Sequence, residues 1–338
     1  MNATEPDINP RTVLAVAPMM DWTDRHCRLF HRRLNPAVRL FSEMVTAKAV
    51  LFGDRERLLG FSPQEQPVVL QLGGSDPAEL SQAATIAAQW GYDEINLNVG
   101  CPSDRVQGGR FGACLMREPR LVGDCLAAMG ECGRPVSLKC RIGVDDQDRE
   151  AALDAVADEA VRADVAAIWV HARKAWLSGL SPAQNRDVPP LDYDRVFRLK
   201  ARIGRFVGIN GGISTAPEVR AMTERVDGVM IGRAAYQRPG ILAELAGHTG
   251  EAHRQHRLAV AREMVPYAAH WIERGGRLSN VAKHMLGLFH GEPGARAWRR
   301  TLTVAGQAPG ASADLLSDAI DAVERAGEAA KGDVSAAA

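Results

Sequence analysis

Short apolar segments alternate with longer amphipathic segments along most of the chain. Each of the short segments is rich in β-branched or other apolar residues, and each is followed by a stretch with helical periodicity. Strict alternation of this kind predicts strands of a parallel sheet connected by helices. We expect β-strands at 13–19, 39–45, 67–74, 94–100, 135–143, 166–173, 205–211 and 227–233. A helix is expected at 76–91, since Asp-Pro begins this segment and Gly ends it.

The number and length of these units predict an α/β protein with a closed (β/α)8 TIM barrel at residues 1–250. A doubly wound open sheet is the alternative, but it needs no eighth strand and usually carries a GxGxxG turn, which the chain lacks. Beyond Gly250 no strand pattern follows, and we expect helices at 252–274, 278–290, 293–306 and 312–330. These segments predict a small helical domain at 251–330 and a disordered Ala-rich tail at 331–338.

Composition is that of an ordinary globular protein, because 46% of the 338 residues are hydrophobic and 24% are charged. Lys plus Arg and Asp plus Glu both number 41, so any polyanionic partner must be held by a local patch. Residues 251–310 contain nine Lys or Arg against four Asp or Glu. That surplus suits nucleic acid, and it equally suits a solvated helix face.

The chain shows neither a secretory signal pattern nor an apolar run long enough to cross a membrane. We therefore expect a cytoplasmic protein without a membrane partner. The six cysteines form no CxxC pair and show no metal-ligand spacing. They are expected to be free thiols, mostly in the core, and no metal site is predicted.

Polar residues stand where the expected strands end, which is the end of a barrel that carries the active site. Asn210, Gly211 and Gly212 follow the seventh strand, and Gly232 and Arg233 follow the eighth. Backbone N–H groups at these two turns commonly bind phosphate, and an arginine adds a forked donor. The bland alternative is that the glycines serve only the backbone turn.

Lys139 and His171 lie on buried strands near the same end of the barrel. A lysine buried there without an anionic or electron-rich ligand is costly. It could form a Schiff base, stabilise the pyrimidine edge of a flavin, or pair with a carboxylate. Cys101 directly follows the fourth strand and precedes a glycine-rich loop at 107–113, so a proton-transfer role is favoured over a core-filling one.

Six ordered motifs resemble those of the tRNA-dihydrouridine synthases. The matching strings are APMMDWTD (17–24), LNVGCPSDRVQGGRFGACLM (97–116), SLKCRIGVDD (137–146), VHARKAWLSGLSPAQNRDVPPLDY (170–193), INGGI (209–213) and DGVMIGRAAYQRPGIL (227–242). The segment that begins HARKAWLSGLSP is similar to the A subfamily. The resemblance runs from about residue 13 to 305 and covers both expected domains.

This resemblance implies an FMN-dependent oxidoreductase that uses NADPH to reduce uridine 20, and 20a, of the tRNA D-loop to 5,6-dihydrouridine. Reduced flavin would deliver hydride to C6 of the uracil, and Cys101, as a neutral thiol, would protonate C5. The positions that match FMN-binding residues of the family are Pro18, Met19, Met20, Gln71, Lys139, His171, Asn210, Gly211, Gly212, Gly232 and Arg233.

The family resemblance also implies tRNA contacts. A uridine inside folded tRNA must be flipped out to reach a barrel mouth. Asn98 is expected to orient the uracil, while Ala183, Arg186, Arg296 and Arg299 are expected to contact tRNA. Trp298 stands among the arginines and suits base stacking, or equally the core of the helical domain. No obligate protein partner is implied.

Three other hypotheses remain open from the residues alone. A small-molecule flavin enzyme similar to dihydroorotate dehydrogenases would not need a basic helical domain. A flavin-free lyase would use Lys139 as a Schiff base and would purify without a yellow chromophore. A non-catalytic RNA-binding module would bind RNA without flavin and without turnover.

Overall fold

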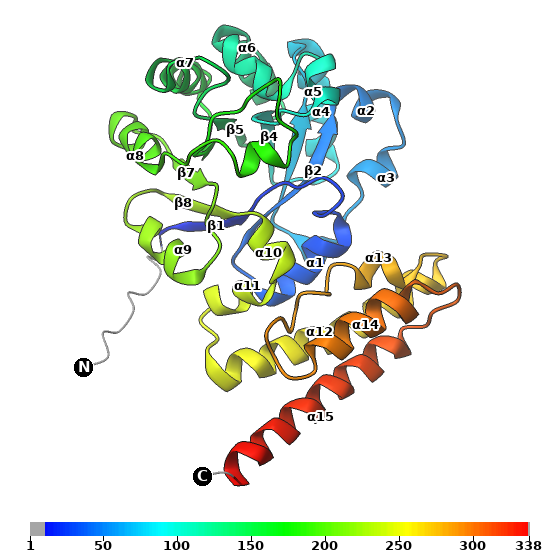
Figure 1. The fold of residues 1–338 in the computed structure, drawn as a ribbon. Helices are drawn as coiled ribbons and strands as arrows, with labels where there is room; N and C mark the ends of the chain where they lie inside the picture. Colours follow the sequence, from blue (N-terminus) through cyan, green and yellow to red (C-terminus); the bar gives the residue numbers. More distant parts are fainter. Residues whose placement is uncertain (1–10, 337–338) are drawn as a thin grey trace, which may run out of the picture. The chain divides into compact units, whose positions relative to one another are not determined.

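The computed structural model describes residues 11–336, except for the side chains of residues 104, 105 and 332–336. Its central feature is a closed barrel of parallel strands in the order β1 to β8 (Figure 1). The barrel closes where Val13–Val16 pairs in parallel with Gly228–Ile231. The strands are β1 Val13–Val16, β2 Arg39–Thr46, β3 Val68–Gly73, β4 Glu94–Val99, β5 Val136–Arg141, β6 Ala167–His171, β7 Val207–Asn210 and β8 Gly228–Ile231. The predicted fold class and every predicted strand are confirmed.

Helices and short turns connect successive strands of the barrel. Helix α4 begins after Asp76, whose side chain accepts the Glu79 N–H at 2.9 Å, as expected for the 76–91 segment. From β2 onward the connecting helices are α2 Ala47–Phe52, α3 Arg55–Leu59, α4 Pro77–Gln89, α5 Asp104–Gly108, α6 Pro119–Gly130, α7 Arg149–Arg162, α8 Tyr193–Arg202 and α9 Ala216–Thr223. The 3-10 turns are η1 Pro63–Glu65, η2 Gly112–Arg117 and η3 Gln184–Arg186.

A second compact unit is helical, and it comprises His26–Val38 and the chain from Arg233 onward. Its core includes Trp298, which is fully buried, packs edge-on against Phe289 at 5.0 Å and donates its indole N–H to the Met285 carbonyl. The helices are α1 Arg25–Leu34, α10 Arg233–Gln237, α11 Gly240–Leu245, α12 Gly250–Glu273, α13 Leu278–Ala282, α14 Ala295–Val304 and α15 Asp314–Ala336, with the 3-10 turn η4 Ala305–Gln307.

The boundary between the two units differs from the one predicted at residue 250. Helices α10 and α11, and nearly all of α1, belong to the helical unit. Asn35 donates its side-chain amide to the Leu242 carbonyl, and the His256 ring lies 3.1 Å from the Leu34 carbonyl oxygen. Because these pairs are 207 and 222 positions apart in the sequence, local periodicity carries no sign of them.

Two other expectations differ in detail. The helix expected at 278–290 stops at Ala282. The chain then continues in tight turns, in which the Met285 N–H donates to the Ala282 carbonyl and the Leu288 N–H donates to the Met285 carbonyl. A Cβ on Gly287 would lie 2.0 Å from the Gln237 carbonyl oxygen, so the backbones approach closely there. The tail at 331–338, expected to be disordered, overlaps α15, which extends to Ala336, and residues 337–338 lie outside the described residues.

Part of the barrel interior is apolar and is dominated by one aromatic side chain. Trp169 is fully buried and packs with Phe41 and Phe206 at ring distances of 6.1 and 5.3 Å. Two neighbouring strands make room for it with glycine. A Cβ on Gly208 or Gly228 would lie 2.2 or 2.6 Å from the indole ring, far inside contact distance. The shape of the tryptophan therefore dictates glycine at both positions.

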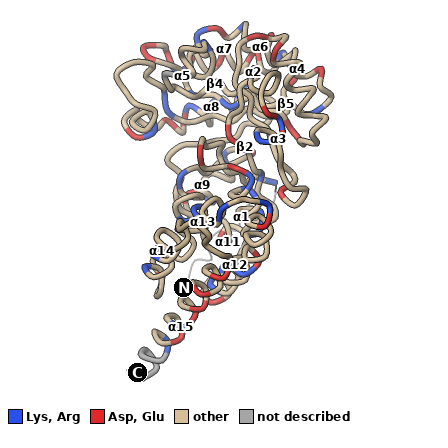
Figure 2. Tube along the Cα trace, turned by 90° about the vertical axis from the view of Figure 1, so that its right-hand side faces the viewer, with Lys and Arg blue, Asp and Glu red and all other residues tan. Residues whose placement is uncertain are grey.

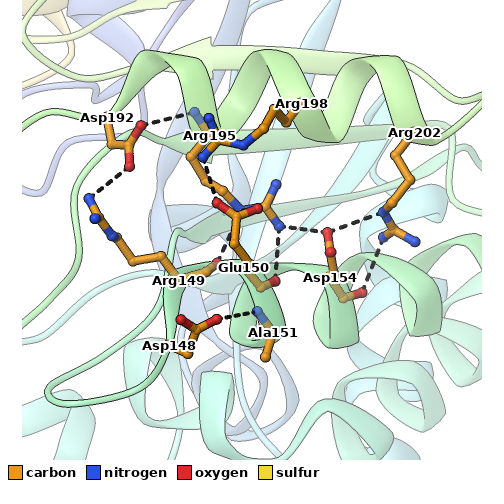
Figure 3. A network of polar contacts seen from close by, with 9 residues as sticks. All are labelled: Asp148, Arg149, Glu150, Ala151, Asp154, Asp192, Arg195, Arg198 and Arg202. Carbon is orange, nitrogen blue, oxygen red and sulfur yellow. Dashed lines mark hydrogen bonds and ion pairs between the residues drawn. The ribbon is translucent and has the colours of Figure 1, made fainter.

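An ion-pair network connects α7 to α8 on the outside of the barrel (Figure 3). At its centre Arg195 is 1% exposed and bonds to Asp154 at 2.6 Å and to Glu150 at 3.1 Å. Its guanidinium also donates to the Arg149 and Glu150 carbonyls. Arg198 also pairs with Glu150 but is 54% exposed. Because hydration competes weakly at the buried site, we expect Arg195 to carry most of the network's stabilisation.

Substitution Arg195→Met tests that expectation. It removes several charge-assisted hydrogen bonds from a buried position, so the free energy of unfolding should fall by about 2–3 kcal/mol in urea denaturation. The matched control Arg198→Met removes an exposed partner of the same network and should cost less than about 1 kcal/mol. Equal losses in the two variants would contradict the assignment.

Candidate active site

The carboxyl ends of five neighbouring strands bring together predicted site residues at one end of the barrel. Asn98 on β4 is the register partner of Lys139 on β5, and His171 on β6 is the register partner of Asn210 on β7. Gln71 on β3 reaches the same group, because its side-chain oxygen accepts from Asn98 Nδ2 at 2.7 Å. Residues far apart in sequence therefore form one polar surface within the barrel.

Lys139 is the cation of this surface. Its Nζ donates to Asn210 Oδ1 at 3.1 Å, and Asn210 Nδ2 donates in turn to the Met230 carbonyl, which fixes the amide with its oxygen toward the lysine. Burial and the nearby Arg141 guanidinium lower the pKa of Lys139 to about 8. No carboxylate pairs with it among the described residues. Such a group gains free energy when an anionic or electron-rich ligand lies beside it.

The turn after β4 holds Cys101 in a defined backbone geometry. Asn98 Oδ1 accepts the N–H groups of Gly100 and Cys101 at 3.0 and 2.9 Å. The Cys101 carbonyl accepts the Ala113 N–H at 2.9 Å, which ties the turn to the start of η2. At Gly112 φ is +73°, and a Cβ there would lie 2.6 Å from the Cys101 carbonyl oxygen. Only glycine fits this position beside the thiol-bearing turn.

Cys101 differs in burial from several other cysteines of the chain. Cys101 is partly exposed, and its Sγ lies 3.5 Å from Ser103 Oγ. Cys125 and Cys140 are buried, and burial raises the pKa of each thiol to about 12. They are inert core residues, as expected. Cys132 lies just beyond the end of α6 and is partly exposed.

Two glycines after β7 form a turn that side chains could not occupy. Gly211 and Gly212 have φ of +112° and +73°. A Cβ on Gly211 would lie 3.0 Å from the His171 ring, and one on Gly212 would lie 2.5 Å from Leu191. Tyr193 Oη donates to the Gly211 carbonyl at 2.7 Å, which holds the peptide in place. This is a backbone surface that a phosphate can approach closely.

Residues of the remaining predicted FMN turns are also defined. Pro18 and Met19 are partly exposed after β1, and Met20 is 53% exposed. The Met19 N–H donates to Thr23 Oγ1 at 3.0 Å, which closes this turn. Gly232 follows β8, and a Cβ added to it would lie 3.9 Å from Met19 Sδ. Arg233 is the next residue and begins α10.

The long loop after β6 is held by two side chains that the sequence analysis did not assign. Arg141 is buried and donates to the carbonyls of Gly100, Lys174 and Asn185 at 2.9 Å. Asn185 is fully buried, and its amide accepts the Trp176 N–H and donates back to the Trp176 carbonyl. Gln107, on α5, donates its side-chain amide to the Leu177 carbonyl at 2.7 Å. Asn185 lies within the NRDVPPLDY string, but only a structure shows its burial.

The predicted tRNA contacts fall into three groups. Ala183 and Arg186 are exposed on the loop after β6, and Arg296 and Arg299 are exposed on α14, which carries basic positions while α15 carries acidic ones (Figure 2). Asn98 is 8% exposed, and both ends of its amide are engaged within the barrel. Trp298 is in the core, so it offers no exposed ring between the arginines.

Within the described part of the chain, no cluster of three or more His, Cys, Asp or Glu side chains is placed to hold a metal ion. The helices of residues 11–336 include none with the length and apolar character needed to cross a bilayer.

The barrel and the polar groups at its strand ends define an enzyme of the (β/α)8 class. Comparison with known proteins identifies the family: the model of "Dihydrouridine synthase" matches residues 15–324. The chain belongs to the dihydrouridine synthase family, which confirms the recognised resemblance and the expected class of oxidoreductase.

Curated relatives are similar over nearly the whole chain. A protein of Xanthomonas axonopodis pv. citri is 54% identical over 91% of this chain and 93% of its own length. One from Shigella flexneri is 50% identical over 91% of this chain and 92% of its own length. One from Vibrio parahaemolyticus is 48% identical over 91% of this chain and 95% of its own length. Each is named tRNA-dihydrouridine(20/20a) synthase.

Solved structures support the fold. Morphinone reductase superimposes with a TM-score of 0.53 at 12% identity, over 75% of this chain and 94% of its own. At this level of identity the similarity speaks for the barrel architecture alone.

The turn that carries Cys101 can be tested through Gly112. Alanine there combines an unfavourable φ with a clash against the Cys101 carbonyl, so Gly112→Ala should lower the free energy of unfolding by about 1–3 kcal/mol. Peptide mapping after iodoacetamide treatment should show faster alkylation of Cys101. Gly108→Ala is the matched control, because a Cβ there meets no atom within 4 Å. If the control behaves like Gly112→Ala, the clash is not the cause.

Proposed function

We propose that this protein reduces uridine 20, and 20a, of the tRNA D-loop to 5,6-dihydrouridine, with FMN as cofactor and NADPH as reductant. The observation that carries the proposal is the agreement of two independent features. Relatives named for this activity match over nine-tenths of the chain. The barrel mouth presents a partly exposed cysteine, a lysine without a carboxylate partner among the described residues, and a glycine turn.

The residues at the mouth fit FMN. The turn at Gly211 and Gly212 leaves backbone that a Cβ would cover, and Gly232 and Arg233 add a second turn and a guanidinium, so these residues with Asn210 would hold the phosphate. Lys139 would lie beside the electron-rich ring edge, where its charge is satisfied. Gln71 and His171 would contact the same edge, and Pro18, Met19 and Met20 would pack along the ring.

FMN bound at these residues would supply the redox chemistry, which is a hydride for C6 of the uracil that originates from NADPH. The protein's own chemical step is the proton transfer to C5. Cys101 Sγ is the donor, and its S–H bond breaks as the new C5–H bond forms. The resulting thiolate takes a proton from solvent, so NADPH, one proton and uridine yield NADP+ and dihydrouridine. The Asn98 contacts to the Cys101 N–H hold the donor in place.

The first experiment is nucleoside mass spectrometry of unmodified tRNA after incubation with protein, FMN and NADPH. Wild type should add two hydrogens to D-loop uridine, and Cys101→Ala should be slower by about 10²- to 10⁴-fold. Flavin reduction by NADPH should be unchanged in this variant, because it does not use the thiol. Cys132→Ala, which removes another partly exposed thiol, is the control. A wild type that oxidises NADPH but leaves tRNA unchanged would indicate a small-molecule flavin reductase instead.

The tRNA-binding role of α14 rests on charge that carboxylates do not neutralise. Arg296 and Arg299 are exposed, and neither forms an ion pair with another described residue. Phosphates are therefore the partners that these cations would meet in a complex. The loop after β6 would add Ala183 and Arg186 to the contact with the flipped nucleotide's neighbours.

Replacing Arg296 and Arg299 by Ala should weaken tRNA binding without slowing chemistry at saturating tRNA. Each lost phosphate contact should reduce the slope of log affinity against log salt by about 0.7–0.9. Filter binding across salt concentrations measures the slope. Arg202→Ala removes an arginine that pairs with Asp154 and Asp158 and should leave the slope unchanged. An unchanged slope in the α14 variant would contradict the role of this helix.

A further inference from the structure

Buried polar side chains fill the barrel interior along β3, β4 and β5. They lie between the amino-terminal end of β4, where Glu94 is its first residue, and the turn after β4 that carries Cys101. All are at most 8% exposed: Gln71, Glu94, Asn96, Asn98 and Ser137. Buried polar groups are tolerated only where each finds a partner, so their mutual arrangement is constrained.

Their hydrogen bonds form one continuous chain. The Cys101 N–H donates to Asn98 Oδ1 at 2.9 Å, and Asn98 Nδ2 donates to Gln71 Oε1 at 2.7 Å. Gln71 Nε2 then donates to Asn96 Oδ1 at 2.8 Å. The chain goes on from Asn96 Nδ2 to Ser137 Oγ at 2.8 Å, and Ser137 Oγ donates to Glu94 Oε1.

The groups at the two ends of this hydrogen-bond chain require the same donor-to-acceptor direction. A peptide N–H can only donate, so the Cys101 end requires an acceptor from Asn98. At the other end Glu94 Oε2 pairs with Arg39 at 3.1 Å, and a carboxylate paired with a guanidinium only accepts. Turning any one amide around would place two donors or two acceptors face to face, and a buried mismatch of that kind is costly.

We propose that Glu94 is a positioning residue for Cys101, because it fixes the direction of the hydrogen-bond chain that presents Asn98 Oδ1 to the Cys101 turn. The importance of this turn for catalysis rests on the proposed function, in which Cys101 is the proton donor. The hydrogen-bond chain itself does not depend on the proposed function. Glu94 acts from the opposite end of β4 without contacting the reacting groups.

A change of direction provides the test. Asn98→Asp keeps an acceptor for the Cys101 N–H but has no donor for Gln71 Oε1. Gln71 and Asn96 can then turn around, which moves the mismatch to Ser137 and the Glu94 carboxylate. Adding Glu94→Gln supplies a donor at that end and leaves its oxygen toward Arg39. The second substitution should therefore repair the first.

Two measurements on the full chain as purified report the repair without using turnover. They are the thermal midpoint and the rate of Cys101 alkylation by iodoacetamide, followed by peptide mass spectrometry. Asn98→Asp should shift both, and Asn98→Asp/Glu94→Gln should return both toward wild type. We expect a coupling of at least about fivefold in the alkylation rate, within the range seen for residues in one hydrogen-bond network.

A charge-matched control separates direction from net charge. Glu65 is fully buried and accepts the Ser62 N–H, and it takes no part in the hydrogen-bond chain. Asn98→Asp/Glu65→Gln therefore restores the net charge without giving Ser137 a new hydrogen-bond donor. It should not repair Asn98→Asp. Should Asn98→Asp fail to fold, Gln71→Glu places the same mismatch one link further along, and Glu94→Gln should repair it too. Additive effects of the paired substitutions, or equal repair by Glu65→Gln, would overturn the proposal.

The same variants distinguish this proposal from the proposed function. If wild type makes no dihydrouridine but Glu94→Gln still restores the alkylation rate of Asn98→Asp, the positioning role of Glu94 is supported and the proposed function is contradicted. If wild type makes dihydrouridine and no coupling appears, the activity stands and Glu94 has no positioning role. If both proposals are correct, Asn98→Asp should slow uridine reduction by a larger factor than it slows flavin reduction by NADPH. Adding Glu94→Gln should make these two factors more similar.

Discussion

A closed barrel must fill its own interior, and in this protein part of that interior is filled by polar groups that satisfy one another. Water cannot reach Asn96 or Ser137, so their partners must come from neighbouring strands. The strand register supplies them, since Gln71, Asn96 and Ser137 are aligned across β3, β4 and β5. The same register places Lys139 and Asn98 side by side at the end where a ligand would bind. Interior packing and site geometry are thus one arrangement.

Much of the fold follows from the sequence, because a parallel barrel has a strong local signature. Its strands are short segments rich in apolar residues, each followed by a helical segment, and helix starts such as Asp76-Pro77 are marked by capping residues. The site could be predicted for a related reason: the carboxyl ends of barrel strands meet at one end, so Lys139 and Asn210 had to lie near each other. The recognised motifs added the identity of the family.

What the sequence did not predict depends on contacts between distant segments. The grouping of α1 with the C-terminal helices rests on pairs such as Asn35 and Leu242, which no local pattern reports. Trp298 has arginine neighbours in sequence, yet its ring is in the core because the helix turns it toward Phe289. Asn98 suits a uracil contact by position, but its buried partners are visible only in three dimensions.

The packing of Trp169 over Gly208 and Gly228 has a consequence for how this protein can change over generations. A larger residue at either glycine is accepted only after the tryptophan has been replaced by something smaller. Replacing the tryptophan first leaves a cavity, which is itself destabilising. Every single-step path through these three positions therefore crosses a less stable intermediate. The three sites are epistatic, and they are expected to persist or to be exchanged as a set.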